Sequence, residues 1–235
     1  MATEVCTADK CKEPATLEHV LTCTHGSNIK DRHNIPIDTV KEIALIALGD
    51  PHNQKGWAKT EPWIRTEAEA AALNANLPPG TRPAKALRGD LALKKIITQG
   101  SGVLMLDGRC TYPDGQTART KLTKVLLDDQ EKEKRTKHQA ACAVKHMTFL
   151  PLVWTTCGAK GNGFMKLVNI LSKRLADRWR KPKGRCKAWI NARLAVAIAN
   201  ATSSCIRNVR GSLSDAVNHM PFYDGAAIAG GVVRF

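Results

Sequence analysis

The chain has 235 residues, of which 43% are hydrophobic, and a formal net charge of +15. This length and composition indicate a globular chain that can bury one sizeable core plus a small appendage. The positive charge predicts a polyanionic partner. Because the sequence has no apolar run of about 18 residues, a membrane partner is excluded and nucleic acid is expected.

The first motif is a cluster of metal-ligand residues, Cys6, Cys11, His19 and Cys23. Zinc prefers four thiolate or imidazole ligands in a tetrahedron, and a short loop followed by a helical turn supplies them. His25 is a competing fourth ligand. Because no ligand position stays open, we expect a structural zinc ion. The other five cysteines are scattered through apolar segments and predict reduced core thiols.

The segment after the cluster predicts a helix, a strand and a second helix. Asp38 is the expected N-cap of the first helix. Residues 55–65 predict one edge strand, where a proline is tolerated. Residues 66–85 predict an alanine-rich helix that is ended by the proline-rich stretch at 77–83. Residues 31–34 are compatible with a solvated turn or with a phosphate contact.

Two acidic residues stand beside apolar strand candidates. Asp90 precedes the run at 91–93, and Asp107 ends the run at 102–106. A hairpin between these runs would bring the two carboxylates together, and paired carboxylates can hold Mg²⁺. Spacing alone favours the alternative that the two residues are polar ends of two strands.

A charged helix is predicted from about Leu122 onwards. It carries Glu131, Lys134 and His138 on one face, with Lys137 beside them. An ammonium group close to two carboxylates can stabilise charge on a phosphate under attack. Such a helix face is otherwise a solvated surface of mixed charge.

These motifs resemble the zinc knuckle and restriction-like endonuclease domain at the C-terminus of site-specific non-LTR retrotransposons, a branch of the PD-(D/E)XK nucleases. Arg88-Gly89-Asp90 is similar to the family's basic residue, Pro and Asp, and Asp107 stands at its second acidic position. Residues 131–137 resemble its Glu-Lys-Arg-x-Lys helix. The resemblance covers residues 6–179. The sequence departs from the family at Gly89 and in the longer intervals around Asp107.

The resemblance implies an α/β fold with a restriction-endonuclease-like mixed sheet flanked by helices. It divides the chain into a knuckle (1–34), a nuclease domain (35–180) and a basic C-terminal helix and tail (181–235). The implied activity is a metal-dependent DNA endonuclease that nicks its target to prime reverse transcription. The implied catalytic residues are Asp90 and Asp107, which would bind Mg²⁺, and Lys134 and Lys137. Whether Mg²⁺ or Mn²⁺ is preferred stays open.

A basic stretch follows the nuclease domain: nine Lys or Arg and no acidic residue lie between Arg178 and Arg210. The stretch predicts a basic loop at 180–185, a helix at 189–206, and nucleic-acid binding with steep salt dependence. A solubilising surface is the alternative. The nucleic-acid-binding candidates are Arg32, His33, Arg88, Arg135, Arg180, Lys181, Lys183 and Arg185.

Two alternative functions stay open. Because Met1 lies five residues before Cys6, we expect a stand-alone copy, which suits a retired nuclease fold within a large ribonucleoprotein such as a ribosome. The other alternative is a zinc-knuckle transcriptional regulator. Expected partners are DNA, RNA in the ribonucleoprotein alternative, and a reverse transcriptase region or other subunits of a nucleoprotein complex. The segment after Met1 resembles no signal peptide, so we expect nuclear residence, or a cytoplasmic ribonucleoprotein in the alternative.

Overall fold

The computed structural model describes residues 5–6, 8, 11–23, 25, 28–75, 77–78, 80–98, 100–115 and 118–207. The helices are α1 (Leu17–Thr22), α2 (Asn28–Leu48), α3 (Glu67–Asn74), α4 (Thr123–Val144), α5 (Asn162–Trp179) and α6 (Lys183–Arg207). The strands are β1 (Ala58–Thr60), β2 (Trp63–Arg65), β3 (Leu87–Arg88), β4 (Leu91–Lys94), β5 (Val103–Thr111) and β6 (Thr148–Thr155).

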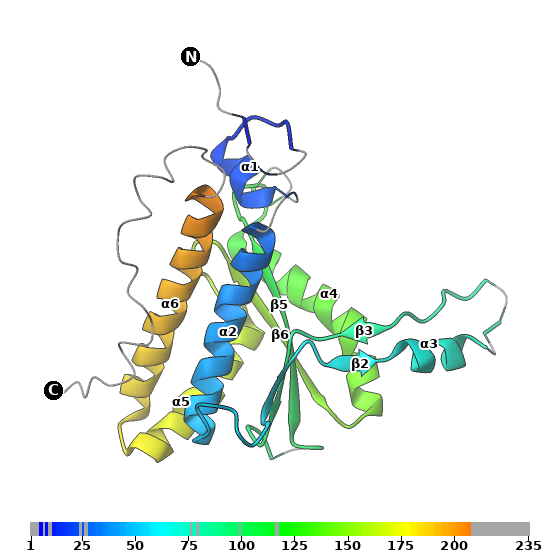
Figure 1. Ribbon diagram of the computed structural model, residues 1–235, viewed down its shortest axis with the longest axis vertical. Helices are drawn as coiled ribbons and strands as arrows, with labels where there is room; N and C mark the ends of the chain where they lie inside the picture. Colours follow the sequence, from blue (N-terminus) through cyan, green and yellow to red (C-terminus); the bar gives the residue numbers. More distant parts are fainter. Residues whose placement is uncertain are drawn as a thin grey trace.

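The main sheet has four strands in the order β1-β4-β5-β6. β4 pairs antiparallel with both β1 and β5, whereas β6 is parallel to β5 and is reached through α4. Helices α2, α5 and α6 lie on one face of this sheet and α4 lies on the other (Figure 1). The predicted α/β class, with a mixed sheet flanked by helices, is confirmed.

Side chains of β5 alternate between the two faces of the sheet, as the pleat of a strand requires. Leu104 and Leu106 are buried in the larger core with α2, α5 and α6. Met105 packs instead with Cys142 of α4. Asp107 follows in the same alternation, and its carboxylate faces α4.

The strand predicted over residues 55–65 is wrong as a single element. It divides into β1, in the main sheet, and β2, which pairs with β3 in a separate two-stranded sheet. The break falls at Glu61, whose φ of 46° turns the chain, and at Pro62, which has no N–H to donate to a sheet. The chain therefore leaves the main sheet at this point.

The described residues between 63 and 88 form an arm that projects from the body of the molecule (Figure 1). The arm contains β2, α3 and β3. The hydroxyl of Thr66 accepts a hydrogen bond from the Glu69 N–H, and the Glu69 carboxylate accepts one from the Thr66 N–H, which fixes the start of α3. This helix ends at Asn74, shortly before the proline-rich stretch at 77–83 that was predicted to end it.

Helix α2 begins at Asn28, ten residues before its predicted N-cap at Asp38. Pro36 lies inside the helix and is buried, together with Ile37. Tertiary packing of this turn overrides the usual helix-breaking tendency of proline. The domain boundary predicted after residue 34 falls within α2.

Helix α6 begins at Lys183, immediately after Pro182, so Lys183 and Arg185 lie in its first turn and not in a loop. Proline just before a helix is favoured, because its fixed φ suits the first turn. Among the described helices, none has the length and apolar character needed to cross a membrane. The predicted tail at 208–235 lies outside the described residues.

Candidate metal centre and carboxylate site

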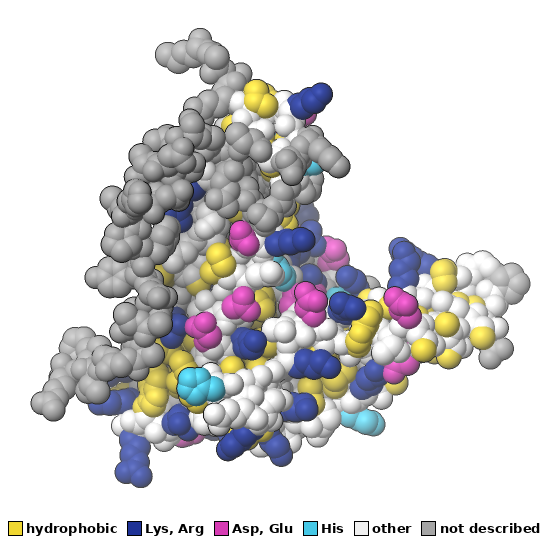
Figure 2. All heavy atoms as spheres, viewed as in Figure 1, with side chains coloured by type: hydrophobic (Ala, Val, Ile, Leu, Met, Phe, Trp, Pro, Cys, Tyr) yellow, Lys and Arg dark blue, Asp and Glu magenta, His cyan; other side chains and the backbone are white. Residues whose placement is uncertain are grey.

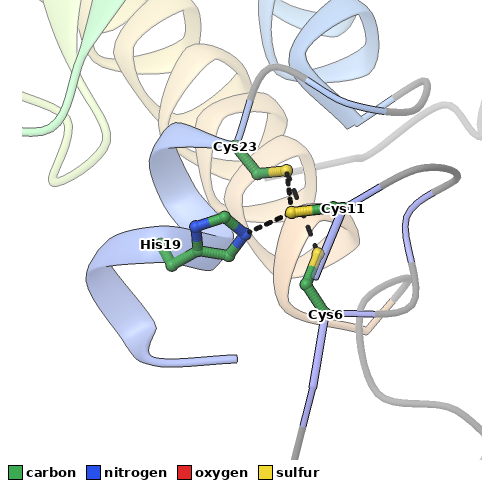
Figure 3. Close-up of side chains that lie close together, drawn as sticks. All are labelled: Cys6, Cys11, His19 and Cys23. Carbon is green, nitrogen blue, oxygen red and sulfur yellow. Dashed lines mark hydrogen bonds between the residues drawn. The ribbon is translucent and has the colours of Figure 1, made fainter. Parts of the chain in front are cut away.

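Three cysteines and a histidine meet at the N-terminal end of the molecule (Figure 3). The Cys11 sulfur lies 3.2 Å from His19 Nε2 and 3.8 Å from the Cys23 sulfur, and the Cys6 and Cys23 sulfurs are 3.9 Å apart. All four ligand atoms lie within 4.8 Å of one another. Zn–S bonds of about 2.3 Å in a tetrahedron place sulfurs about 3.8 Å apart. The cluster could therefore hold a metal such as zinc.

Short local structure positions these four ligands. Helix α1 presents His19, and Cys23 caps its C-terminal end. Cys6 is held by its N–H, which donates to the Glu13 carbonyl. Cys23, and not His25, belongs to the group of side chains that could hold a metal. The backbone carbonyl of His25 lies 3.7 Å from the Cys23 sulfur.

Burial, together with the neighbouring Cys11 and Cys6 side chains, raises the pKa of the Cys23 thiol to about 11, although the hydrogen bond to the His25 carbonyl opposes this rise. A thiol in this environment keeps its proton unless a cation binds beside it. Zinc binding favours the thiolate and releases the proton. A metal ion bound here would therefore have to displace this proton.

The metal cluster packs on the end of α6. Val20 and the buried cysteines form a small core, and Ile206 of α6 packs against it. The knuckle is thus attached to the body through α6 as well as through the chain that leads into α2.

Asp90 lies directly before β4 and beside β5. Its N–H donates to the Leu106 carbonyl at 3.0 Å, and its carboxylate Oδ2 accepts from the Gly108 N–H at 2.5 Å. His33 Nε2 lies 3.2 Å from the same oxygen. The backbone of Asp90 thus lies across the strand pair from that of Asp107, whereas the two carboxylates contact different helices: the Asp90 carboxylate lies against His33 of α2 and the Asp107 carboxylate lies against Lys134 of α4.

Asp107 is buried in the middle of β5, not at its end as predicted, because β5 continues to Thr111 alongside β6. Lys134 Nζ lies 2.5 Å from its Oδ2, and His138 Nε2 lies 3.2 Å from that oxygen. Burial alone would raise the pKa of the Asp107 carboxyl. Contact with His138 and the charge of Lys134 outweigh burial, so this pKa lies below its ordinary value.

The other candidates on α4 lie apart from Asp107. Glu131 is buried and accepts from the Gly163 N–H at 2.7 Å, and Arg135 lies 3.7 Å from its carboxylate. The hydrogen bond from the Gly163 N–H to Glu131 anchors the start of α5. Lys137 is exposed, and its side chain makes no hydrogen bond or ion pair with the described residues. Only Lys134 of the two predicted lysines reaches the carboxylate.

Gly89 stands where proline was expected from the resemblance, and the structure gives a physical reason. Its N–H donates to the Pro62 carbonyl at 3.0 Å, which proline could not do. A Cβ at this position would lie 2.6 Å from the Met105 sulfur. Close packing on β5 therefore favours glycine here.

No family model matches this chain, and the search of the curated proteins gave no match. Functional reasoning therefore depends on the two sites and on the distribution of charge.

The predicted nucleic-acid-binding residues fall into separate regions. Arg32 lines a cavity of about 550 Å³ with residues of α1, β5 and α4. Arg88 lies at the base of the arm, over the Trp63 ring. Exposed basic residues surround the junction of α5 and α6: Arg180, Lys181, Lys183 and Arg185. That junction is at the opposite end of α6 from the metal cluster, about 36 Å away for a helix of 25 residues.

Sequence reasoning did not assign a role to His138 at this site. Its position one helical turn after Lys134 was the available signal, since residues four apart on a helix share a face. His33 was predicted to contact phosphate, and the structure places it against Asp90 instead. No local pattern linked His33 to Asp90.

Proposed function

We propose that this chain is a metal-dependent endonuclease of the non-LTR retrotransposon type, which nicks target DNA to prime reverse transcription. The observation that carries the proposal is the ion pair between Lys134 and Asp107, with Asp90 on the adjacent strand. Two carboxylates and one ammonium group on neighbouring elements are the residues that hydrolysis of a phosphodiester requires.

The order of elements supports this proposal. A helix, three antiparallel strands, a second helix and a parallel strand follow one another as α2, β1, β4, β5, α4 and β6. The two acidic residues belong to the central strand pair, and the lysine belongs to the helix that follows it. The proposed restriction-like fold would use these elements in this order, with the arm inserted between β1 and β4.

The donor set fits Mg²⁺, which binds proteins through one or two carboxylates and keeps several waters. The Oδ1 atoms of Asp90 and Asp107 accept no hydrogen bond from the described residues. These two side chains would hold the ion, which would supply Lewis-acid activation of the phosphate. Among the described residues, the Cys/His cluster is the one group of three or more ligand side chains within reach of a shared ion, so the remaining magnesium ligands would be water and phosphate.

Lys134 and His138 have distinct roles in the proposed reaction. Lys134 donates to the reacting phosphate or orients the attacking water, because its ammonium group is partly exposed beside Asp107. His138 is fully buried and holds Asp107 in place. It is a positioning residue.

The proposal is tested by incubating the purified chain with supercoiled plasmid and Mg²⁺. We expect nicked circles from the wild type, none from Asp107→Ala, and DNA affinity that is nearly unchanged in that variant. Asp114→Ala, at an exposed turn, is the matched control and should nick normally. Cleavage by Asp107→Ala would refute the assignment.

A second comparison separates the two lysines. Because Lys134 reaches Asp107 and Lys137 does not, Lys134→Ala should lower the nicking rate by a factor on the order of 100. Lys137→Ala should keep most of the activity. Equal losses in both variants would contradict the role given to Lys134.

One observation favours a second function, that of a nuclease fold that binds nucleic acid without cutting it. The Oδ2 atom of Asp90 is engaged by the Gly108 N–H and by His33, so this oxygen is held by the protein itself. A binding component of a ribonucleoprotein would shift plasmid DNA or structured RNA and leave it uncut with either Mg²⁺ or Mn²⁺.

A further inference from the structure

Trp63 differs from the other four tryptophans because it is exposed. Its exposed fraction is 37%, whereas Trp154 is fully buried and Trp179 packs edge-on against Trp189 at 4.9 Å. The neighbouring Ile64 is buried against the α4 side of the main sheet. Because successive side chains of a strand point in opposite directions, Trp63 points away from that core.

The indole of Trp63 is held in place by Arg88. The two residues are directly opposite each other in the β2-β3 pair. The Arg88 guanidinium lies 3.9 Å from the centre of the Trp63 ring, and one of its nitrogens lies 3.6 Å from the Glu61 carboxylate. Cation–π contact and the Glu61 ion pair both restrict these side chains, so the aromatic surface is preorganised.

Backbone hydrogen bonds join this pair to the carboxylate site. The Gly89 N–H donates to the Pro62 carbonyl, and the Glu61 N–H donates to the Asp90 carbonyl, both at 3.0 Å. Arg88 is two residues from Asp90 in the chain. Figure 2 shows the arm projecting from the body, with acidic and basic side chains gathered on the surface between them. Nucleic acid bound at Asp90 would therefore pass close to Trp63.

We propose that Trp63 and Arg88 form a stacking platform for an unpaired base, next to the phosphate bound at the carboxylate site. An exposed indole stacks on any base, and a neighbouring guanidinium adds attraction for the backbone. This inference rests on the proposed function. It adds a substrate class to that function: nucleic acids with an unpaired nucleotide beside the cut, such as a flap or a frayed end.

The test measures binding, by fluorescence anisotropy, of a labelled single-stranded DNA and of the blunt duplex with the same sequence. No divalent cation is added, so nothing is cut. Trp63→Leu should weaken single-strand binding about tenfold and change duplex binding less than about twofold. Trp63→Phe, which keeps an aromatic ring, should retain most of the affinity.

Trp57 provides a matched control. It also carries a cation over its ring, with Lys55 Nζ at 4.7 Å. It precedes β1 at the end of the strand where Ala58 pairs with Leu93, whereas Thr60 at the other end pairs with Leu91, next to Asp90. Trp57→Leu should therefore leave binding of both DNAs unchanged.

The result that would overturn the platform is a Trp63→Leu variant that binds single strands as the wild type does, or equal losses in the Trp63→Leu and Trp57→Leu variants. A failure of the nuclease proposal would give a different result. If Trp63→Leu lost single-strand binding while the wild type left the plasmid uncut, the platform would be supported and only the cleavage activity would be refuted.

Discussion

At the scale of single residues, the environment of Asp107 determines what the carboxylate site can do. A buried carboxylate is costly unless a cation compensates for it. Lys134 and His138 approach the same oxygen of Asp107 and keep its pKa low. Asp107 is therefore ionised at neutral pH and ready to bind a cation or a polarised water.

The lowered pKa of Asp107 predicts a pH dependence of stability. A group whose pKa is lower in the folded state stabilises the fold above its ordinary pKa, and that stabilisation is lost as pH falls through the folded value. Asp107→Asn should therefore cost about 3 kcal/mol at neutral pH, because it leaves Lys134 without its partner. The cost should shrink below about pH 4. Urea unfolding of both proteins across pH measures this, and a pH-independent difference would contradict the assignment.

At the scale of elements, the knuckle is a small unit that cannot bury enough apolar surface by itself. Its core consists of Val20 and three thiols, closed by Ile206 from α6. Metal binding can supply the missing stabilisation, because a structural zinc site contributes folding energy directly. A metal held by the four side chains would therefore stabilise α1 in the position where Ile206 of α6 packs against it.

Removing one ligand tests the metal centre. The wild type should contain a single zinc ion per chain, and Cys11→Ser should lose it and lower Tm on the order of 10 °C. Cys157 is exposed and lies outside the cluster, so Cys157→Ser should keep both the zinc and the Tm. Elemental analysis measures the zinc content of each variant, and thermal unfolding measures its Tm. Full zinc content in Cys11→Ser would contradict the ligand assignment.

The turn from β6 into α5 depends on a glycine. A Cβ at Gly163 would lie 2.1 Å from the Pro151 carbonyl oxygen, so the backbone would have to move. Gly163→Ala should destabilise the protein by about 2 kcal/mol. At Gly184, in the first turn of α6, a Cβ would meet nothing within 4 Å, and Gly184→Ala should be neutral or stabilise by about 0.5 kcal/mol. Similar unfolding curves for the two variants would contradict this prediction.

At the scale of the whole molecule, the chain has a net charge of +15, and two separate regions are candidate contacts for nucleic acid. One is the carboxylate site with the arm, and the other is the junction of α5 and α6. The junction lies at the far end of α6 from the metal cluster. A nucleic acid that contacts both regions must extend along the molecule.

The salt dependence of binding tests the junction. Replacing Arg180, Lys181, Lys183 and Arg185 together with Gln should reduce the slope of log K against log salt by about 3 for duplex DNA, since each lost phosphate contact contributes about 0.9. All four residues are exposed, so the fold should be retained. An unchanged slope would show that these charges only solubilise the protein.

The sequence by itself predicted the features that depend on residues close together in the chain. The spacing of Cys6, Cys11, His19 and Cys23 predicted the metal cluster. The apolar runs predicted the β4-β5 pair, and the helical spacing of Glu131, Lys134 and His138 predicted α4. These signals are local, because helical and strand periodicity and ligand spacing are properties of short segments.

Only the tertiary structure decided which distant residues meet. The sequence named both Lys134 and Lys137 as candidate catalytic residues. Packing of α4 on β5 brought Lys134, and not Lys137, to Asp107. Packing also directed His33 to Asp90 and exposed Trp63 at the base of the arm. Such contacts depend on how elements separated by tens of residues pack together, and no short segment of sequence contains that information.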